Sequence, residues 1–409
     1  MNFDYILLIT AVLLGLSVVA SKFATKVGVP VLLIFIAIGM LAGSEGPGGI
    51  WFTDAVVTQR VGIVALSFIL FSGGMDTHWQ TTKPILTKAL CLATFGVLAT
   101  AAIVGFIAHH MLGFTVLEGL LLGSIIASTD ASAVFSILST GSMKVRKDIT
   151  ALLEMESGTN DPTAVFLTLG FTTAIATNKP ISPTLAGNFA WEMIVGCIWG
   201  LAFGKLGIIT MKRLRLPFEG MYHVVTICVV LASYAGAAIL HASGFLAVYV
   251  AGLVYGEGTF RQLKGLKRFH EGIAWLMQIT MFLVLGLLIF PSSLPKIAFE
   301  GVLVSVVLIF IARPIGVFLS MSLFKDTLKT KVLVAWTGLR GAIPIILATF
   351  PLLAGISKAH EIFNIVFFVV LFSTIIQGTT LPWVFKLLDR GQGDILITPD
   401  STVEAQTPA

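Results

Sequence analysis

The chain has 409 residues, of which 56% are hydrophobic and only 11% are charged. Because a soluble domain carries roughly 25% charged residues, this composition excludes an ordinary soluble protein and predicts that lipid is the main solvent. A net charge of +5 would suggest a nucleic-acid partner in a soluble protein, but here we attribute it to cytoplasmic loops and expect no nucleic acid to bind.

The apolar runs, taken in chain order, predict an all-α polytopic membrane protein. A bilayer core about 30 Å thick requires roughly 20 apolar residues per helix, which gives thirteen expected transmembrane helices. Their approximate ranges are 4–22, 29–43, 57–74, 86–112, 115–139, 148–177, 187–213, 220–240, 244–256, 268–290, 297–322, 328–354 and 360–388. The run 244–256 is too short to cross the bilayer without its neighbours. Asp4 before the first run and Lys22 after it reverse the charge order of a signal peptide, so we expect this helix to be retained.

Lys and Arg residues in the predicted loops alternate between two sides of the membrane. Nineteen fall in the loops of one side and only four in the loops of the other. Since positively charged loops stay in the cytoplasm, this pattern predicts an external N-terminus and a cytoplasmic C-terminus. The polar segment 391–409 is expected to be a disordered cytoplasmic tail that follows a membrane domain of residues 1–390.

Two of the expected helices carry interruptions at matching positions. Thirteen spans permit two six-helix inverted repeats around a central helix, and the fifth helix of each repeat (helices 5 and 12) is predicted to be discontinuous, at 128–132 and at 338–344. Interrupted helices in matching positions of two halves indicate a mid-membrane binding site in transporters. Gly and Pro also kink ordinary helices, but the charges of Asp130 and Arg340 in these two breaks favour a functional interpretation.

Several ionisable residues fall inside the predicted spans, where each costs about 2.5–3.5 kcal/mol and usually marks function. They are Asp130, Glu154, Glu156, Asp161, Arg313 and Arg340. Because the acids outnumber the arginines, at least one carboxylate should lack a partner, and such a group takes up a proton or binds a metal cation. An ion-exchange site needs this behaviour.

The densest polar cluster is the run from residue 156 to residue 162. Ser157 and Asp161 share a helix face, with Glu156 and Asn160 beside them. Pro162 cannot donate a backbone hydrogen bond and so frees a carbonyl one turn earlier. Carboxylate, hydroxyl, amide and carbonyl oxygens suit alkali cations, and no His or Cys lies among them to bind a transition metal. The alternative interpretation is a polar seam between helices with a proline kink.

In combination, three motifs resemble the signatures of NhaP-type monovalent cation/proton antiporters. They are Thr129-Asp130, Asn160-Asp161-Pro162 and Gly338-Leu339-Arg340-Gly341, and the resemblance covers nearly the whole membrane region. The segment 281–286 is most similar to the bacterial cell-volume-regulation branch of potassium/proton antiporters. This resemblance implies a multi-pass protein of the bacterial inner membrane that forms a homodimer.

The same resemblance implies a division of the membrane region into two domains. A core domain would comprise approximately 86–177 and 297–388, and a dimerisation domain approximately 1–74 and 187–290. The core domain would hold the crossed, unwound helices that contain the ion site.

The resemblance also implies a role for each site residue. Asp161 would be the carboxylate shared by proton and cation, with Ser157 as a further ligand, a backbone carbonyl from Thr129, and Asp130 at the crossing of the broken helices. Glu156 would form an ion pair with Arg340, while Arg313 would offset the charges of the helix ends and orient Asn160.

One position departs from the family pattern. Many relatives have an acid before Gly-Gly in the third helix, whereas this chain has Ser72 before Gly73 and Gly74. A hydroxyl therefore replaces a carboxylate as a possible third-helix ligand, and the preference between potassium and sodium stays open.

The expected mechanism is competition at Asp161, where loading of a cation expels the proton, followed by alternating access. Because residue 160 is Asn, the neighbouring residues Asn160 and Asp161 supply only one titratable group, which favours one-for-one, electroneutral exchange. Glu154 could add a second titratable group. The sequence contains no Walker A motif, so the proton gradient is the expected driving force, with no cofactor and no enzyme activity.

A sodium or lithium/proton antiporter is the nearest alternative. A cation channel or uniporter is a further alternative, but the sequence shows no filter-like repeat of the kind that a channel uses. An intramembrane enzyme would need a nucleophile–base pair or an HExxH motif, and the sequence shows neither.

Overall fold

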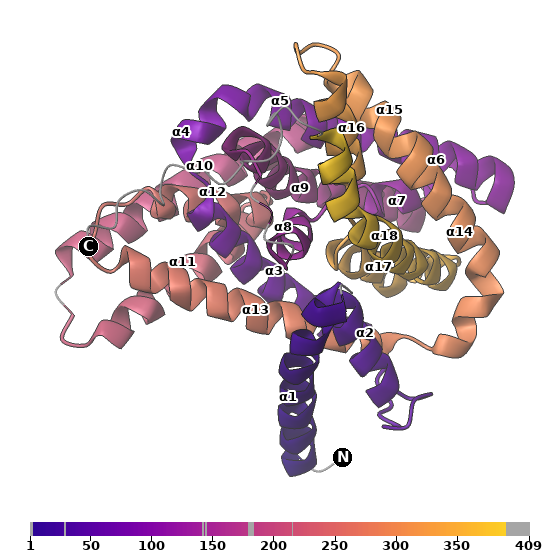
Figure 1. The fold of residues 1–409 in the computed structure, drawn as a ribbon, viewed down its shortest axis with the longest axis horizontal. Coiled ribbons are helices and arrows are strands. Elements are labelled where there is room, and N and C mark those ends of the chain that lie inside the picture. The colour runs from indigo at the N-terminus through magenta and orange to yellow at the C-terminus, as the bar shows by residue number, and fades with distance from the viewer. Residues whose placement is uncertain are drawn as a thin grey trace, which may run out of the picture.

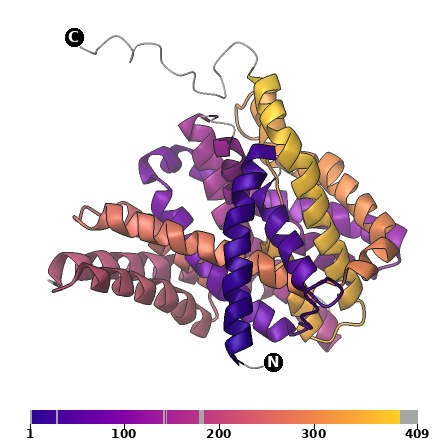
Figure 2. The same ribbon diagram turned by 60° about the horizontal axis from the view of Figure 1, so that its bottom comes forward.

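A computed structural model of the chain shows an assembly of packed helices (Figures 1 and 2). It describes residues 3–27, 30–140, 143, 145–178, 184–214 and 216–389. Every named element within these ranges is a helix, which confirms the predicted all-α class. The tail predicted for 391–409 lies outside the described residues.

The helices follow one another along the chain with short connections. In chain order they are α1 (Phe3–Val27), α2 (Val31–Ala42), α3 (Ala55–Asp76), α4 (Trp79–Thr82), η1 (Lys83–Ile85), α5 (Leu86–Cys91), η2 (Leu92–Gly96), α6 (Val97–Leu112), α7 (Val116–Ile125), α8 (Ala131–Thr140), α9 (Lys147–Thr177), α10 (Thr184–Arg213), α11 (Glu219–Ile239), α12 (Gly244–Gly256), α13 (Leu263–Leu288), η3 (Pro291–Ile297), α14 (Ala298–Val307), η4 (Leu308–Ala312), α15 (Arg313–Ser320), α16 (Leu328–Trp336), α17 (Ile343–Leu353) and α18 (Ala359–Leu388).

The predicted spans agree with this order. Each of them overlaps one or more helices, and the short run 244–256 coincides with α12. Among the described residues, eight stretches are long and apolar enough to cross a membrane, by length and composition. The shorter apolar helices are α2, α7, α12 and α17. A membrane protein with many helices is therefore confirmed, whereas the number of crossings stays a prediction.

The two helices predicted to be discontinuous are both interrupted. The first consists of α7 and α8, which are separated by residues 126–130, and the second consists of α16 and α17, which are separated by residues 337–342. Thr115 caps the start of α7 together with Glu118, and Thr327 caps the start of α16, so each broken helix has a defined beginning. The breaks leave backbone groups without helical partners at the centre of the assembly.

Close glycine contacts join α3 to α12 and α2 to α13. α3 packs on α12, where a Cβ at Gly74 or Gly252 would overlap backbone atoms of the other helix. α2 and α13 approach each other in the same way at Gly39 and Gly286. Small residues allow such backbone contact between membrane helices. Because α3 also contacts α9 and α17, it joins this group of helices to the broken pair.

Two π-helical turns lie in the helices that precede each broken helix. η2 runs into α6 and contacts α15, while η4 runs into α15 and contacts α6. The two helices meet where Gly96 faces Gly316. A π-helical turn shifts the register of the side chains that follow it, and such turns are frequent at functional sites. Arg313 is the first residue after η4.

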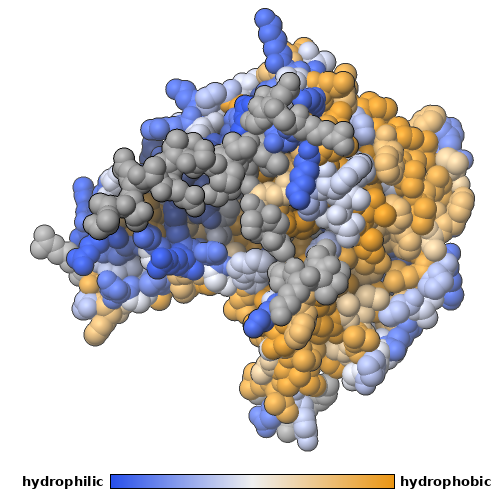
Figure 3. Space-filling view, viewed as in Figure 1, coloured by the Kyte–Doolittle hydropathy of each residue, from blue (hydrophilic) through white to orange (hydrophobic). Residues whose placement is uncertain are grey.

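Apolar side chains cover much of the outer surface. Along α1, Tyr5, Leu8 and Val18 are exposed, and Figure 3 shows hydrophobic side chains over α1 and along the side formed by α14. A soluble monomer rarely exposes apolar patches of this extent. This surface is suited to contact with lipid.

Candidate functional site

The two breaks meet in the middle of the assembly. The backbone N–H of Asp130 donates a hydrogen bond of 2.9 Å to the carbonyl of Leu339. The Asp130 carboxylate accepts hydrogen bonds from the Ser132 hydroxyl and from the Ala133 backbone N–H, and so caps the start of α8. A Cβ at Gly341 would overlap the other carboxylate oxygen of Asp130, so the crossing requires glycine there. Asp130 therefore lies at the crossing of the broken helices.

α9 passes this crossing without a break. Pro162 lies inside α9, which continues to Thr177. One face of α9, consisting of Glu154, Ser157, Gly158 and Asp161, lines a cavity of about 220 Å³. The spacing of these residues is i, i+3, i+4 and i+7, which is the spacing of a single helical stripe.

Asp161 is the most deeply buried acid of this cavity, with 2% of its surface exposed. Its Oδ1 accepts a hydrogen bond of 2.6 Å from the Ser128 hydroxyl. Its Oδ2 is buried and has no hydrogen-bond partner among the described residues. An ionised carboxylate can accept about four hydrogen bonds, so this oxygen has room for a proton or a cation. Ser128 directly precedes the Thr129-Asp130 motif but was not among the predicted site residues.

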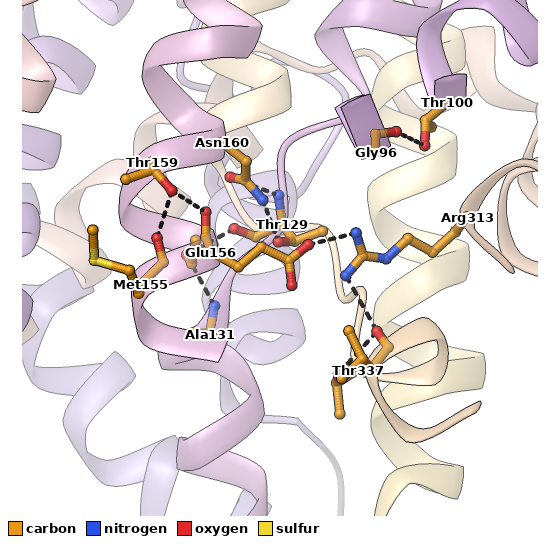
Figure 4. Close-up of polar contacts among 12 residues, drawn as sticks. Gly96, Thr100, Thr129, Ala131, Met155, Glu156, Thr159, Asn160, Arg313 and Thr337 are labelled. Atoms are coloured by element: carbon orange, nitrogen blue, oxygen red, sulfur yellow. Dashed lines mark hydrogen bonds and ion pairs between the residues drawn. The ribbon is translucent and has the colours of Figure 1, made fainter. Parts of the chain in front are cut away.

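Ser157 and Asn160 tie α9 to the first break, and Figure 4 shows Asn160 next to Thr129. The Ser157 hydroxyl donates to the Thr129 carbonyl at 2.9 Å and accepts from the Ala131 N–H at 3.3 Å. The Asn160 amide donates to the Thr129 hydroxyl at 2.6 Å and accepts from the Thr129 N–H at 3.4 Å. The oxygen groups expected to bind a cation are therefore gathered here, but Ser157 and Thr129 are hydrogen bonded to each other.

The expected ion pair between Glu156 and Arg340 is wrong. Glu156 lies 2.6 Å from a guanidinium nitrogen of Arg313 instead, and both side chains are at most 4% exposed (Figure 4). A second guanidinium nitrogen of Arg313 donates to the Val334 carbonyl at 3.2 Å. The η4 turn sets the register of Arg313, and Gly338 leaves space for it, because a Cβ there would lie 2.7 Å from Arg313 Nε. Glu156 therefore meets Arg313 rather than Arg340.

Arg313 also does not orient Asn160 as expected, because both groups of the Asn160 amide are bonded to Thr129. Arg340 is only 1% exposed, and none of its three guanidinium nitrogens has a hydrogen-bond partner in the described part of the chain. Its backbone N–H donates to the Ser373 hydroxyl at 3.2 Å, which ties the second break to α18. Arg340 thus contributes a buried positive charge to the crossing, with no direct carboxylate partner among the residues that the structure describes.

Ser72 does not line the cavity, contrary to its expected role as a third-helix ligand. α3 and its C-cap residue line the cavity through Leu66, Ile69, Leu70, Gly73, Asp76 and Thr77. These positions form one helical stripe, and Ser72 lies on another face of α3, where it is buried. Within the described residues, no group of three or more His, Cys, Asp or Glu side chains could hold a metal ion together.

Comparisons with known proteins find similarity along most of the chain. The family described as "Sodium/hydrogen exchanger, transmembrane" matches residues 8–387. The K(+)/H(+) antiporter NhaP of Alkalimonas amylolytica is 40% identical over 382 residues, and the K(+)/H(+) antiporter NhaP2 of Shewanella sp. strain MR-4 is 41% identical over 388 residues. Each match covers 93% of this chain but only 66% of the relative, so the chain spans less than two thirds of their length.

Archaeal proteins are also similar. The Na(+)/H(+) antiporter 1 of Methanocaldococcus jannaschii is 28% identical over 359 residues, which cover 82% of this chain and 81% of that protein. The solved structure of the sodium proton antiporter MjNhaP1 from the same organism matches with a TM-score of 0.78 at 23% identity. That match covers 92% of this chain and all of the solved chain, so the two share a fold.

Proposed function

The chain belongs to the sodium/hydrogen exchanger family, and from this premise we propose that it is a secondary antiporter that exchanges K⁺ or Na⁺ for H⁺ across the bacterial inner membrane. The observation that carries the proposal is the buried Asp161, which lines a cavity and whose Oδ2 has no hydrogen-bond partner within the described residues. The names of the K(+)/H(+) antiporters at 40–41% identity support K⁺, and the name of the archaeal relative at 28% identity supports Na⁺ as the alternative.

The proposed exchange follows from the chemistry of a single carboxylate. Ser128 holds one oxygen of Asp161, which leaves the other oxygen for one ligand at a time. A cation at this oxygen would also draw on the Ser157 hydroxyl and the Thr129 carbonyl, after the hydrogen bond between these two groups opens. Cation and proton thus exclude each other, so loading the cation releases the proton.

Alternating access would move this site between the two sides of the membrane. We propose thirteen crossings in two inverted repeats, with a core of approximately 86–177 and 297–388 that moves against approximately 1–74 and 187–290. The paired breaks, at 126–130 and 337–342, and the paired π-helical turns support this symmetry. The second group of helices would form a homodimer, with the N-terminus periplasmic and the C-terminus cytoplasmic.

Exchange is proposed to be one for one. Because residue 160 is Asn, the Asn160-Asp161 pair contains one titratable group. Electroneutral exchange should respond to ion gradients but not to membrane potential. A potential that drives cation uptake into proteoliposomes, without a pH gradient, would contradict this stoichiometry.

Proton efflux from proteoliposomes tests the function itself. Purified protein is reconstituted with an internal pH-sensitive dye, and K⁺, Na⁺ and Li⁺ are added separately. We expect at least one of these ions to drive proton movement, and we expect Asp161→Asn to abolish it while the protein keeps its wild-type elution profile and melting temperature. Cation flux that is independent of the pH gradient would indicate a channel, and full exchange by the folded Asp161→Asn variant would exclude this site.

A further inference from the structure

Two cavities adjoin each other on the way from the surface to Asp161. The inner cavity is the one lined by Asp161, and an outer cavity of about 670 Å³ is lined by residues near the ends of α3, α9 and α12. Asp76 and Glu154 line both cavities. A cation that moves from the outer cavity to Asp161 therefore passes these two carboxylates.

Helix geometry fixes the distance between Glu154 and Asp161. Both lie on the cavity-lining stripe of α9, seven residues apart, which is close to two helical turns. At a rise of 1.5 Å per residue, their positions along the helix are separated by about 10 Å. The Gly158 position between them lies against the ring of Tyr249, because a Cβ there would come within 2.6 Å of the ring. Glu154 is thus the next acid on the stripe that leads away from Asp161.

Glu154 also differs from the neighbouring acids in its contacts. It is partly buried and has no hydrogen-bond or ion-pair partner in the part of the chain that the structure describes. By contrast, Asp76 lies 3.6 Å from Lys267, and Glu257 lies 3.9 Å from His78 and accepts a hydrogen bond from a backbone N–H. Glu154 therefore keeps its carboxyl oxygens available to an incoming ion.

The surroundings of Glu154 contain charges of both signs. Those that line the two cavities or pair with lining residues are Asp76, His78, Asp130, Lys147, Asp161, Glu257 and Lys267. Asp161 Oδ2, which has no hydrogen-bond partner in the described part of the chain, is buried at the same inner cavity and offers an independent acceptor for a proton or a cation there.

We infer that Glu154 is a recruiting carboxylate: it holds a partly hydrated monovalent cation at the junction of the two cavities, before the ion reaches Asp161. This inference rests on the proposed antiport function and adds a second position to its path. Glu154 holds the ion only on its way to Asp161, so exchange continues without it but needs a higher cation concentration.

The size of the expected effect follows from the separation. For unit charges about 10 Å apart, an effective dielectric constant between 20 and 80 corresponds to a change of roughly two- to fifteen-fold in cation affinity. Glu154→Gln should therefore raise the apparent KM for the cation by about this factor, with little change in the maximal rate. A Glu154→Asp variant keeps the charge and should restore most of the apparent affinity.

Asp148→Asn is a matched control on the same helix. Asp148 is exposed on the first turn of α9, pairs with Arg146 and lines neither cavity. It lies thirteen residues, or about 20 Å, from Asp161, which exceeds the Debye length of about 8 Å at physiological salt. Its removal should leave the apparent KM at the wild-type value.

The experiment measures initial rates of proton movement in proteoliposomes against K⁺ or Na⁺ concentration, whichever ion drives the wild-type protein. The four variants are Glu154→Gln, Glu154→Asp, Asp148→Asn and Asp161→Asn, each at low ionic strength and with added choline chloride. The increase in KM for Glu154→Gln should shrink at high ionic strength, because salt screens the missing charge.

Two results would overturn the inference while the proposed function stands. One is a wild-type KM for Glu154→Gln; the other is a loss of maximal rate in both Glu154 variants without a change in KM, which would indicate a structural role. Failure of the proposed function has a different signature, since Asp161→Asn would then transport like the wild type.

Discussion

Replacing Glu156 with Gln should destabilise the protein, because Arg313 would keep a buried charge without a partner. The carboxylate and the guanidinium lie 2.6 Å apart, with 2% and 4% of their side-chain surfaces exposed. Removal of one member of such a buried pair costs about 3–5 kcal/mol. At about 2 °C per kcal/mol for a chain of this size, the melting temperature should fall by roughly 6–10 °C.

A double-mutant cycle separates the two candidate partners of Glu156. Glu156→Gln combined with Arg313→Gln removes both charges, so the double variant should melt at a temperature close to that of either single variant. Glu156→Gln combined with Arg340→Gln should instead shift the melting temperature by about the sum of the two single shifts, because no hydrogen bond or ion pair joins these two side chains among the described residues.

The assay is thermal unfolding of detergent-purified protein, followed by intrinsic fluorescence and by loss of the monodisperse chromatography peak. Asp148→Asn serves as the surface control, and its melting temperature should stay within about 1 °C of the wild type because an exposed ion pair contributes little. Stronger coupling of Glu156 to Arg340 than to Arg313 would refute the pairing and support the family-derived expectation.

Two further changes test other parts of the structure. Gly341→Ala should abolish exchange, because the added Cβ would overlap the Asp130 carboxylate at the crossing, whereas Gly265→Ala, which meets open space, should be active; equal activity of the two variants would contradict the crossing. Hydrogen bonds from the Ser292 hydroxyl and N–H hold the pKa of Glu45 below its usual value of 4.5. This contact should therefore persist at neutral pH and loosen only below pH 4.5, seen as a lower hydrogen-exchange protection factor at the Ser292 amide; a loss between pH 5 and pH 7 would contradict it.

The sequence was sufficient to locate the broken helices and the acid cluster. Charged residues are costly in the bilayer, so Asp130 and Arg340 in interrupted apolar runs stand out from their surroundings. The 156–162 run stands out for the same reason. Even the short helix 244–256 follows from a run of apolar residues between polar ones.

The partners of these charges could not be predicted in the same way. Which arginine reaches Glu156 depends on the η4 register and on the space at Gly338, and neither is visible in hydrophobic periodicity. The position of Ser72 depends on the rotation of α3, which is set by its glycine contacts with α12. The hydrogen bond from Ser128 to Asp161 joins residues 33 positions apart and arises only when the break folds against α9.

Proton release on cation binding tests most directly whether both ions compete for Asp161. Purified protein in weakly buffered detergent solution receives K⁺ or Na⁺, while a pH indicator reports protons and calorimetry reports binding. We predict about one proton released per cation bound by the wild type and none by Asp161→Asn. Binding of the cation without proton release, or equal release by the Asp161→Asn variant, would contradict the exchange of proton and cation at this carboxylate.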